Sequence, residues 1–217
     1  MTKYFSALFI FTSVLMIGLS PVKAEEITVK RDLRGFDKIR IDEVGIEIDV
    51  MVGEDYSIEI EGEEEIVDHL LMRVRGEKLV IYKDGDKKIW DRAGTDSPKV
   101  TITMPKFTGL DLRGAVDADI KGVDSEEVEF DLKGAGNIEV EGKCGWLILD
   151  FKGTGNIEAE DLHCRQVEVD LKGAGNIEIF ASEKVDADIS GMGNIEVYGN
   201  PGEVTKSDGW FSNITIH

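Results

Sequence analysis

The stretch Val128-Glu-Phe-Asp-Leu-Lys-Gly-Ala-Gly-Asn-Ile-Glu-Val140 decides the fold of this chain, because close copies of it follow one another. The copies share a Gly-x-Gly-Asn-Ile-Glu core with asparagine at positions 137, 156, 176 and 194. A degenerate copy places Asp117 one repeat further upstream. A repeat of about 20 residues with strand-like alternation predicts stacked windings of one chain, each burying the apolar face of its neighbour.

Alternation with a period of two assigns the side chains of each copy to two faces. The inward set is apolar: Val128, Phe130, Leu132, Ile138 and Val140. The outward set is polar: Glu129, Asp131, Lys133, Asn137, Glu139 and Glu141. The glycines suit a corner, since they tolerate positive φ, and stacked asparagines can form a ladder of hydrogen bonds. The pattern predicts an all-β parallel β-helix with regular repeats over residues 107–198.

The flanking segments are expected to belong to the same single domain, residues 25–217. Residues 25–106 alternate less regularly and are expected to form wider, irregular starting coils, with a short helix near 63–70. The polar segment 84–98 is expected to be a loop that carries Trp90. Residues 199–217 depart from the repeat, and Trp210 and Phe211 suit a C-terminal cap over the last open face.

Residues 1–24 have the pattern of a cleaved secretory signal. Lys3 precedes an apolar stretch at 4–19, and cleavage is expected after Ala24. An uncleaved anchor is the weaker alternative, because the stretch is short for a membrane span. No second stretch is long enough to cross a bilayer, so we expect no membrane insertion and a location in the periplasm, at the cell surface or outside the cell.

The balance of charge restricts the partners. The chain has 44 acidic and 25 basic residues and a formal net charge of −19. This charge argues against nucleic acid and anionic membranes as partners, and favours cations and basic groups. Stacking is expected to align a row of aspartates, one per repeat, beside a lysine row that balances it.

A row of glutamates has no such basic neighbour, and its members are candidate calcium ligands: Glu139, Glu158, Glu178 and Glu196. Calcium takes six or more oxygens, whereas this row supplies one carboxylate per winding. A solvated acidic face is therefore the favoured interpretation. We expect no cofactor, with Ca²⁺ as the open alternative.

The two cysteines, Cys144 and Cys164, occupy equivalent places in successive repeats. Equivalent residues of stacked windings lie about 4.8 Å apart, within the Cα range of a disulfide. An exported protein meets conditions in which the bond persists. Two unpaired small residues in an inner or corner row are the equal alternative.

Motifs of enzymes are missing from the sequence. It contains no Gly-x-Ser-x-Gly, no His-Glu-x-x-His and no phosphate-binding loop. The histidines His69, His163 and His217 are expected to lie on different rows. Carboxylate pairs across a groove could serve a glycosidase. Because the acids form uniform rows, we expect no enzyme.

This chain resembles the family named putative auto-transporter adhesin, head GIN domain. The resemblance rests on the Gly-x-Gly-Asn-Ile-Glu copies, the Gly35–Ile39 segment, Met104-Pro105 and the export signal, and it spans nearly all of residues 27–216. It implies a right-handed single-stranded parallel β-helix in the bacterial envelope, with no catalytic residues.

Three functions remain open. The first is an adhesin-like module that binds a glycan or an envelope protein, with Trp90, Phe180 and Tyr198 as contact aromatics. Phe180 and Tyr198 could instead pack under the cap. The second is a structural scaffold whose sheets stack end to end. The third is a carbohydrate-active β-helix enzyme.

Overall fold

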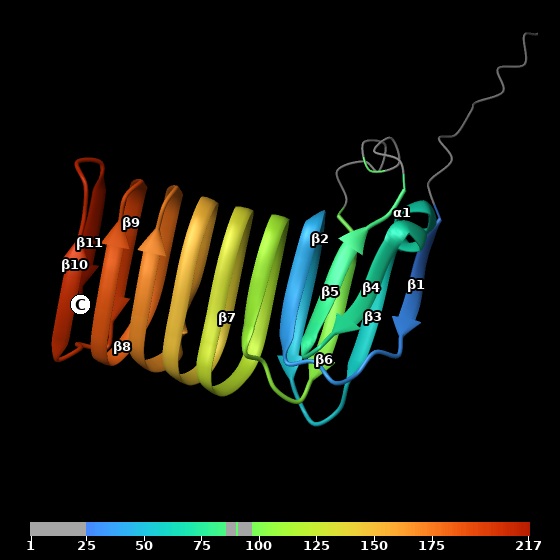
Figure 1. The fold of residues 1–217 in the computed structure, drawn as a ribbon, viewed down its shortest axis with the longest axis horizontal. Coiled ribbons are helices and arrows are strands. Elements are labelled where there is room, and N and C mark those ends of the chain that lie inside the picture. The colour runs from blue at the N-terminus through green and yellow to red at the C-terminus, as the bar shows by residue number, and fades with distance from the viewer. Residues whose placement is uncertain (1–24, 86–89, 91–96) are drawn as a thin grey trace, which may run out of the picture.

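The computed structural model describes residues 25–85, 90 and 97–217 (Figure 1). The expected signal peptide and its cleavage site after Ala24 lie outside these residues, as does most of the expected loop at 84–98. In the described part of the chain, the helical segments are too short and too polar to cross a bilayer.

The fold is all-β, with one mostly parallel sheet. Its elements follow in the order β1 (Glu26–Arg31), β2 (Lys38–Val52), β3 (Ser57–Glu63), α1 (Glu64–His69), β4 (Leu70–Arg75), β5 (Lys78–Lys83), β6 (Lys99–Met104), β7 (Gly109–Leu171), β8 (Ala174–Ile189), β9 (Met192–Tyr198), β10 (Glu203–Ser207) and β11 (Ser212–Ile216). The short helix expected near 63–70 is confirmed as α1, which buries Ile66 and Val67.

The repeated part of the chain forms a stack of parallel windings. Strand β7 runs for 63 residues without interruption, because the chain stays extended through its corners. Equivalent residues of successive copies pair: Asn156 with Asn176, and Asn176 with Asn194. Figure 1 shows these windings side by side along the molecule. The predicted parallel pairing at copy-to-copy register is confirmed.

The core is a column of apolar side chains inside the windings. The isoleucine of each Asn-Ile-Glu copy is buried, from Ile138 to Ile195. Phe36, Phe107 and Phe130 are among the largest fully buried side chains. Burying an isoleucine or phenylalanine contributes about 1.5–3 kcal/mol relative to leaving it exposed. The predicted inward set is therefore the core.

The Gly-x-Gly pairs occupy the corners of the windings. Gly155 has a φ of 141°, a conformation that residues with a Cβ rarely adopt. Gly175 pairs with Gly155 of the preceding winding, and a Cβ on Gly175 would overlap the Gly155 carbonyl group. Glycine is thus needed both for the bend and for the close approach of the backbones.

The N-terminal region is more mixed than the expected wider coils. Strand β2 pairs in parallel with β5, β6 and β7, which continues the stack. The pairs β1–β3, β3–β6 and β4–β5 are antiparallel. The reason is local for β4 and β5, since they are joined by Gly76 and Glu77 alone. So short a turn connects only antiparallel strands.

The C-terminal segment adds a winding in place of an aromatic cap. Strand β10 pairs in parallel with β8, and β11 with β9. The prediction that Trp210 and Phe211 cover the open core was wrong, because their side chains are 99% and 81% exposed. The corner precedes Ser212, so it directs both rings outward. Lys206 instead donates a 3.0 Å hydrogen bond across the winding to the carbonyl of Ile214.

Candidate functional site

The outward face after the corners carries a ladder of amides, which we name the Asn row (Asn137, Asn156, Asn176 and Asn194). The side chain of Asn176 donates to Asn156 Oδ1 at 3.2 Å, and Asn194 donates to Asn176 Oδ1 at 3.0 Å. Asn137 donates to Asp117 Oδ1 at 2.8 Å. Each amide has two N–H donors and two lone pairs, so it keeps hydrogen-bonding capacity toward solvent.

The Glu row (Glu139, Glu158, Glu178 and Glu196) runs beside the Asn row, two residues further along each strand. Glu158 pairs in register with Glu178, and Glu178 with Glu196. The structure thus aligns these three candidate calcium ligands. Among the described residues, Glu139 and Glu158 have no hydrogen-bonding or ion-pairing partner. Glu196, in contrast, accepts a hydrogen bond from Tyr198 and lies 3.3 Å from His217 Nε2, so within this row it is Glu139 and Glu158 whose charge has no partner in the described part of the chain.

A row of aspartates on the strands before the corners is neutralised, in contrast to the Glu row. Lys133 Nζ lies 2.8 Å from Asp131 Oδ2. Lys172 pairs with Asp170 in the same way, two residues along one strand. A third such pair joins Lys152 to Asp150. The basic row expected beside the aspartates is present, and it neutralises Asp131, Asp150 and Asp170 from their own strands.

The carboxylates of the Glu row affect the ionisation of their neighbours. Burial raises the pKa of Glu178, and repulsion from Glu160, Glu196 and Glu158 raises it further. The Tyr198 hydroxyl donates to Glu196 Oε2 at 3.0 Å, and this bond to a carboxylate raises the pKa of Tyr198 to about 12. Repulsion between neighbouring carboxylates thus contributes to the Glu178 shift, after burial, whereas the Tyr198 shift reflects mainly its hydrogen bond to Glu196.

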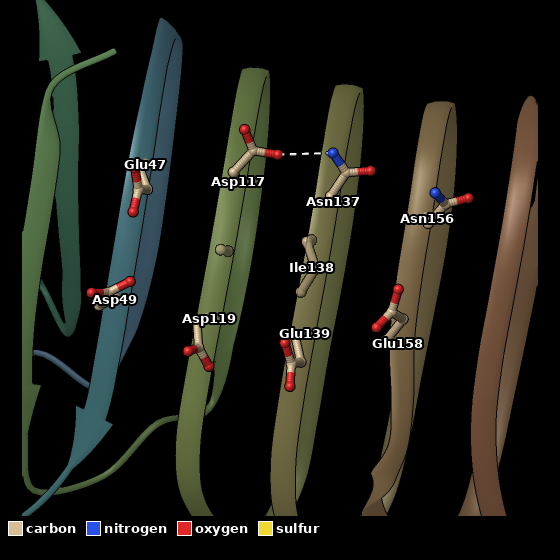
Figure 2. Close-up of a pocket in the computed structure, with 10 residues that line it drawn as sticks. Glu47, Asp49, Asp117, Asp119, Asn137, Ile138, Glu139, Asn156 and Glu158 are labelled. Atoms are coloured by element: carbon tan, nitrogen blue, oxygen red, sulfur yellow. Dashed lines mark hydrogen bonds between the residues drawn. The ribbon is translucent and has the colours of Figure 1, made fainter. Parts of the chain in front are cut away.

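Two shallow hollows follow the Asn and Glu rows. Figure 2 shows the first, of about 240 Å³, with side chains from neighbouring windings arranged in two lines. It is lined by Glu47, Asp49, Asp117, Ala118, Asp119, Asn137, Ile138, Glu139, Asn156 and Glu158. The second, of about 340 Å³, is lined by Asn156, Ile157, Glu158, Asn176, Ile177, Glu178, Asn194 and Glu196. Together they make a polar groove across the windings.

The N-terminal end of this groove contains its own cations. Lys99 Nζ lies 2.7 Å from a carboxylate oxygen of Glu47 and 2.8 Å from one of Asp49. The hydrogen bond to Asp49 makes the largest contribution to raising the pKa of Lys99, and the bond to Glu47 raises it further. Lys121 lies 2.6 Å from Asp119. Sequence reasoning missed Glu47 and Asp49, because the alternation at 46–50 gives no sign that β2 lies next to the copy at Asp117.

An aromatic column flanks the C-terminal half of the groove. Phe180 pairs in register with both His163 and Tyr198. The His163 and Phe180 rings stack at 4.4 Å between centroids, and those of Tyr198 and His217 at 4.8 Å. Phe180 and Tyr198 are half-buried, so the rings offer mainly their edges to a ligand.

The expectation that no two histidines share a row was wrong, since His163 and His217 belong to this column. The cause is a register shift between Ala159 and His163, which the spacing of the repeats does not reveal. Trp90 is partly buried against the core, and its Nε1 donates to the Asp84 carbonyl at 3.1 Å. It does not belong to the groove.

The last strand extends both rows, which sequence reasoning also missed. Asn213 pairs with Asn194, and Thr215 pairs with Glu196. The signal was present in the sequence, because Asn213-Ile214 follows Asn194-Ile195 by one repeat length. The substitution of threonine for glutamate obscured this copy.

A disulfide joins the windings on another side of the stack. Cys144 and Cys164 are bonded, with a Cα–Cα distance of 4.4 Å. No cluster of three or more potential ligands with metal-binding geometry occurs in the part of the chain that the structure describes. The groove can therefore accept hydrogen bonds and positive charge through separate carboxylates, with amides as additional donors and acceptors.

Comparisons with known proteins agree with this architecture. A family model described as "Putative auto-transporter adhesin, head GIN domain" matches residues 35–201. A putative adhesin from Bacteroides fragilis has a similar solved structure, with a TM-score of 0.71, 25% identity, and coverage of 90% of this chain and 98% of that chain.

A putative adhesin from Parabacteroides distasonis shares the fold at 15% identity and a TM-score of 0.50, over 89% of this chain and 98% of that one. A search of curated proteins returns no match.

Proposed function

Because the chain belongs to the family described as putative auto-transporter adhesin, head GIN domain, we propose that it is an exported, non-catalytic binding module. Its groove docks an extended glycan or an envelope protein. The observation that carries the proposal is the Glu row, whose carboxylates Glu139 and Glu158 have no partner among the described residues. The Asn row beside it adds a regular series of amides.

The proposal includes a right-handed single-stranded parallel β-helix as the scaffold. Parallel pairing between successive copies supports it, as does the right-handedness of nearly all crossovers between parallel strands. Such a scaffold repeats one surface along its length, and long regular faces of this kind suit extended partners.

Export to the periplasm or the cell surface is part of the same proposal. The Cys144–Cys164 bond supports it, because structural disulfides persist in oxidising compartments. The description of related proteins as adhesins agrees with a location where partners outside the cell are met.

We propose a non-catalytic role because the Glu row repeats the same residue at the same position of successive windings. Acid–base catalysis by two carboxylates needs environments that set their pKa values apart, so that one donates while the other accepts a proton. Burial sets Glu178 apart by its raised pKa, but Glu158, Glu178 and Glu196 recur once per winding at equivalent backbone positions, and no pair of them interrupts the repeat. We propose no resident cofactor, and calcium remains a ligand to be tested by titration of the folded protein.

Capture from native envelope material tests the binding function. The variant Glu139→Gln/Glu158→Gln removes two charges from the groove, and Glu168→Gln/Asp186→Asn removes two from exposed positions on another outward row. We expect the immobilised protein to retain envelope glycans or proteins, and the groove variant to lose them. Equal capture by wild type and groove variant would contradict the proposal.

A scaffold that associates end to end is the second candidate, and one observation favours it. Trp210, Phe211 and Met192 are 99%, 81% and 59% exposed at adjacent corners of the last windings. Neighbouring exposed apolar side chains commonly mark sites of interaction with another protein. Light scattering over a range of concentrations tests it. Strictly monomeric behaviour would exclude self-assembly, and a Trp210→Ser/Phe211→Ser variant should abolish any association that is seen.

A further inference from the structure

We propose that the half of the groove between Asn156 and Glu196 binds a linear polysaccharide with free amino groups, placing one sugar ring above each winding. This inference rests on the proposed binding function and names the chemical class of its ligand. It uses the second hollow, of about 340 Å³, which lies entirely on the Asn and Glu rows.

The spacing of the rows favours a sugar chain. Neighbouring windings pair in register as parallel strands, which lie about 4.8 Å apart. Pyranose rings of a linear polysaccharide advance by nearly the same distance, and because successive β-1,4-linked rings face opposite ways, amino groups on one side recur at every second winding. In an extended peptide, by contrast, side chains on one side of the chain recur every ~6.6 Å. A basic peptide would therefore fall out of step with the carboxylates.

The hydrogen-bonding groups of the groove complement amino sugars. Ionised glutamates are acceptors only, so the Glu row needs donors from its ligand. Asn176 and Asn194 each use one N–H in the ladder and can offer the other to a ring or hydroxyl oxygen. Hydroxyl and ammonium groups supply donors, and the ammonium adds a charge-assisted bond.

The electrostatics of this half also favour a cationic ligand. Among the described residues, Lys99 and Lys121 pair with carboxylates of the N-terminal half and His217 Nε2 lies 3.3 Å from Glu196 at the C-terminal end, which leaves Glu158 and Glu178 without a basic partner. In the C-terminal half, burial raises the pKa of Glu178, and repulsion from the neighbouring carboxylates of Glu160, Glu196 and Glu158 adds to this effect. An ammonium group between two rungs relieves this repulsion. Phe180 and Tyr198, paired in register and half-buried, lie two residues beyond Glu178 and Glu196 on the same strands.

Isothermal titration calorimetry with defined oligosaccharides tests the inference, in about 0.15 M salt so that non-specific attraction is screened. At mildly acidic pH we expect the hexamer of β-1,4-linked glucosamine to bind the wild type. Its fully N-acetylated counterpart, which has the same shape without the charge, should bind at least about tenfold more weakly.

Matched variants locate the site. Glu158→Gln/Glu178→Gln should weaken binding of the glucosamine hexamer by about tenfold or more. This variant is expected to fold, since it removes repulsion between neighbouring rungs. The control Glu168→Gln/Asp186→Asn, with the same loss of charge, should stay within about twofold of wild type.

Three results would overturn the inference. They are absence of binding by the glucosamine hexamer, equal weakening by both variants, and equal affinity for a lysine hexamer. The last result would mean that charge alone, without the matched spacing, controls binding. If envelope capture depends on the groove while the glucosamine hexamer does not bind, the proposed function stands and only the ligand class is wrong.

Discussion

Replacing Gly175 with alanine is expected to destabilise the stack by several kcal/mol. A Cβ at this position would lie 3.2 Å from the carbonyl carbon of Gly155 and closer still to its oxygen. Non-bonded carbon and oxygen atoms approach to about 3.3 Å. The oxygen is therefore overlapped, and the two windings must separate locally by roughly 1 Å.

Such a separation breaks hydrogen bonds between the windings. The bond from Lys172 N to Phe151 O, at 2.8 Å, would exceed hydrogen-bonding distance. Two broken bonds cost about 2 kcal/mol, and the strain of overpacking adds about 1–3 kcal/mol. We expect the free energy of unfolding to fall by about 3–5 kcal/mol, a large part of the roughly 5–15 kcal/mol typical of a folded domain.

Urea unfolding followed by circular dichroism measures this loss, with Gly202→Ala as the matched control. The nearest atom to a Cβ on Gly202 would be the Glu183 carbonyl oxygen, at 3.9 Å, and the φ of Gly202 is outside the positive region that disfavours other residues. The control should be neutral, or more stable by up to about 1 kcal/mol through the unfolded chain. If Gly175→Ala is as stable as Gly202→Ala, the backbones do not approach as closely as the structure indicates.

Three further predictions concern the disulfide and two ionisable groups. Cys144→Ser/Cys164→Ser opens a loop of sequence separation 20, so thermal unfolding should show a loss of about 3 kcal/mol, and an unchanged midpoint would contradict this role. The pKa of Glu178 is higher in the folded than in the unfolded protein, so ionising this carboxyl lowers the free energy of unfolding. The loss is complete above the folded-state pKa and absent below the unfolded-state pKa. Glu178→Gln should therefore stabilise the protein near neutral pH but not in acid, and a gain that is independent of pH would refute the assignment. Glu196→Gln should lower the pKa of Tyr198 from about 12 toward 10.0, measured by ultraviolet absorbance, and an unshifted titration would show that the hydrogen bond is absent.

Much of the repeated region could be predicted because its rules are local. Alternation with a period of two separates Ile138 from Glu139, and this assignment needs no knowledge of the neighbouring winding. Near-identical copies then specify the register, since a slip by one residue would expose the whole apolar set. The alignment of the Glu row follows from these two rules.

The flanks of the repeat were harder because their partners are distant in sequence. Nothing near Glu47 indicates that it lies beside Asp117, and Lys99 reaches both Glu47 and Asp49 only after β6 pairs with β2. The irregular residues between Ala159 and His163 bring His163 opposite Phe180, although copy spacing alone places it elsewhere. These errors all concern register between segments, which short-range patterns do not encode.

The sequence by itself determined the stacked strands, the inward and outward faces, the glycine corners and the family. These follow from the chirality of the backbone, the period of a strand and the repetition of one motif. Only the tertiary structure decided which basic side chains reach the two ends of the groove. Lys99 contacts Glu47 and Asp49 because β6 pairs with β2, and His217 contacts Glu196 because β11 pairs with β9, so both contacts join segments that are distant in sequence. The groove that we propose as the binding site is a product of that long-range arrangement.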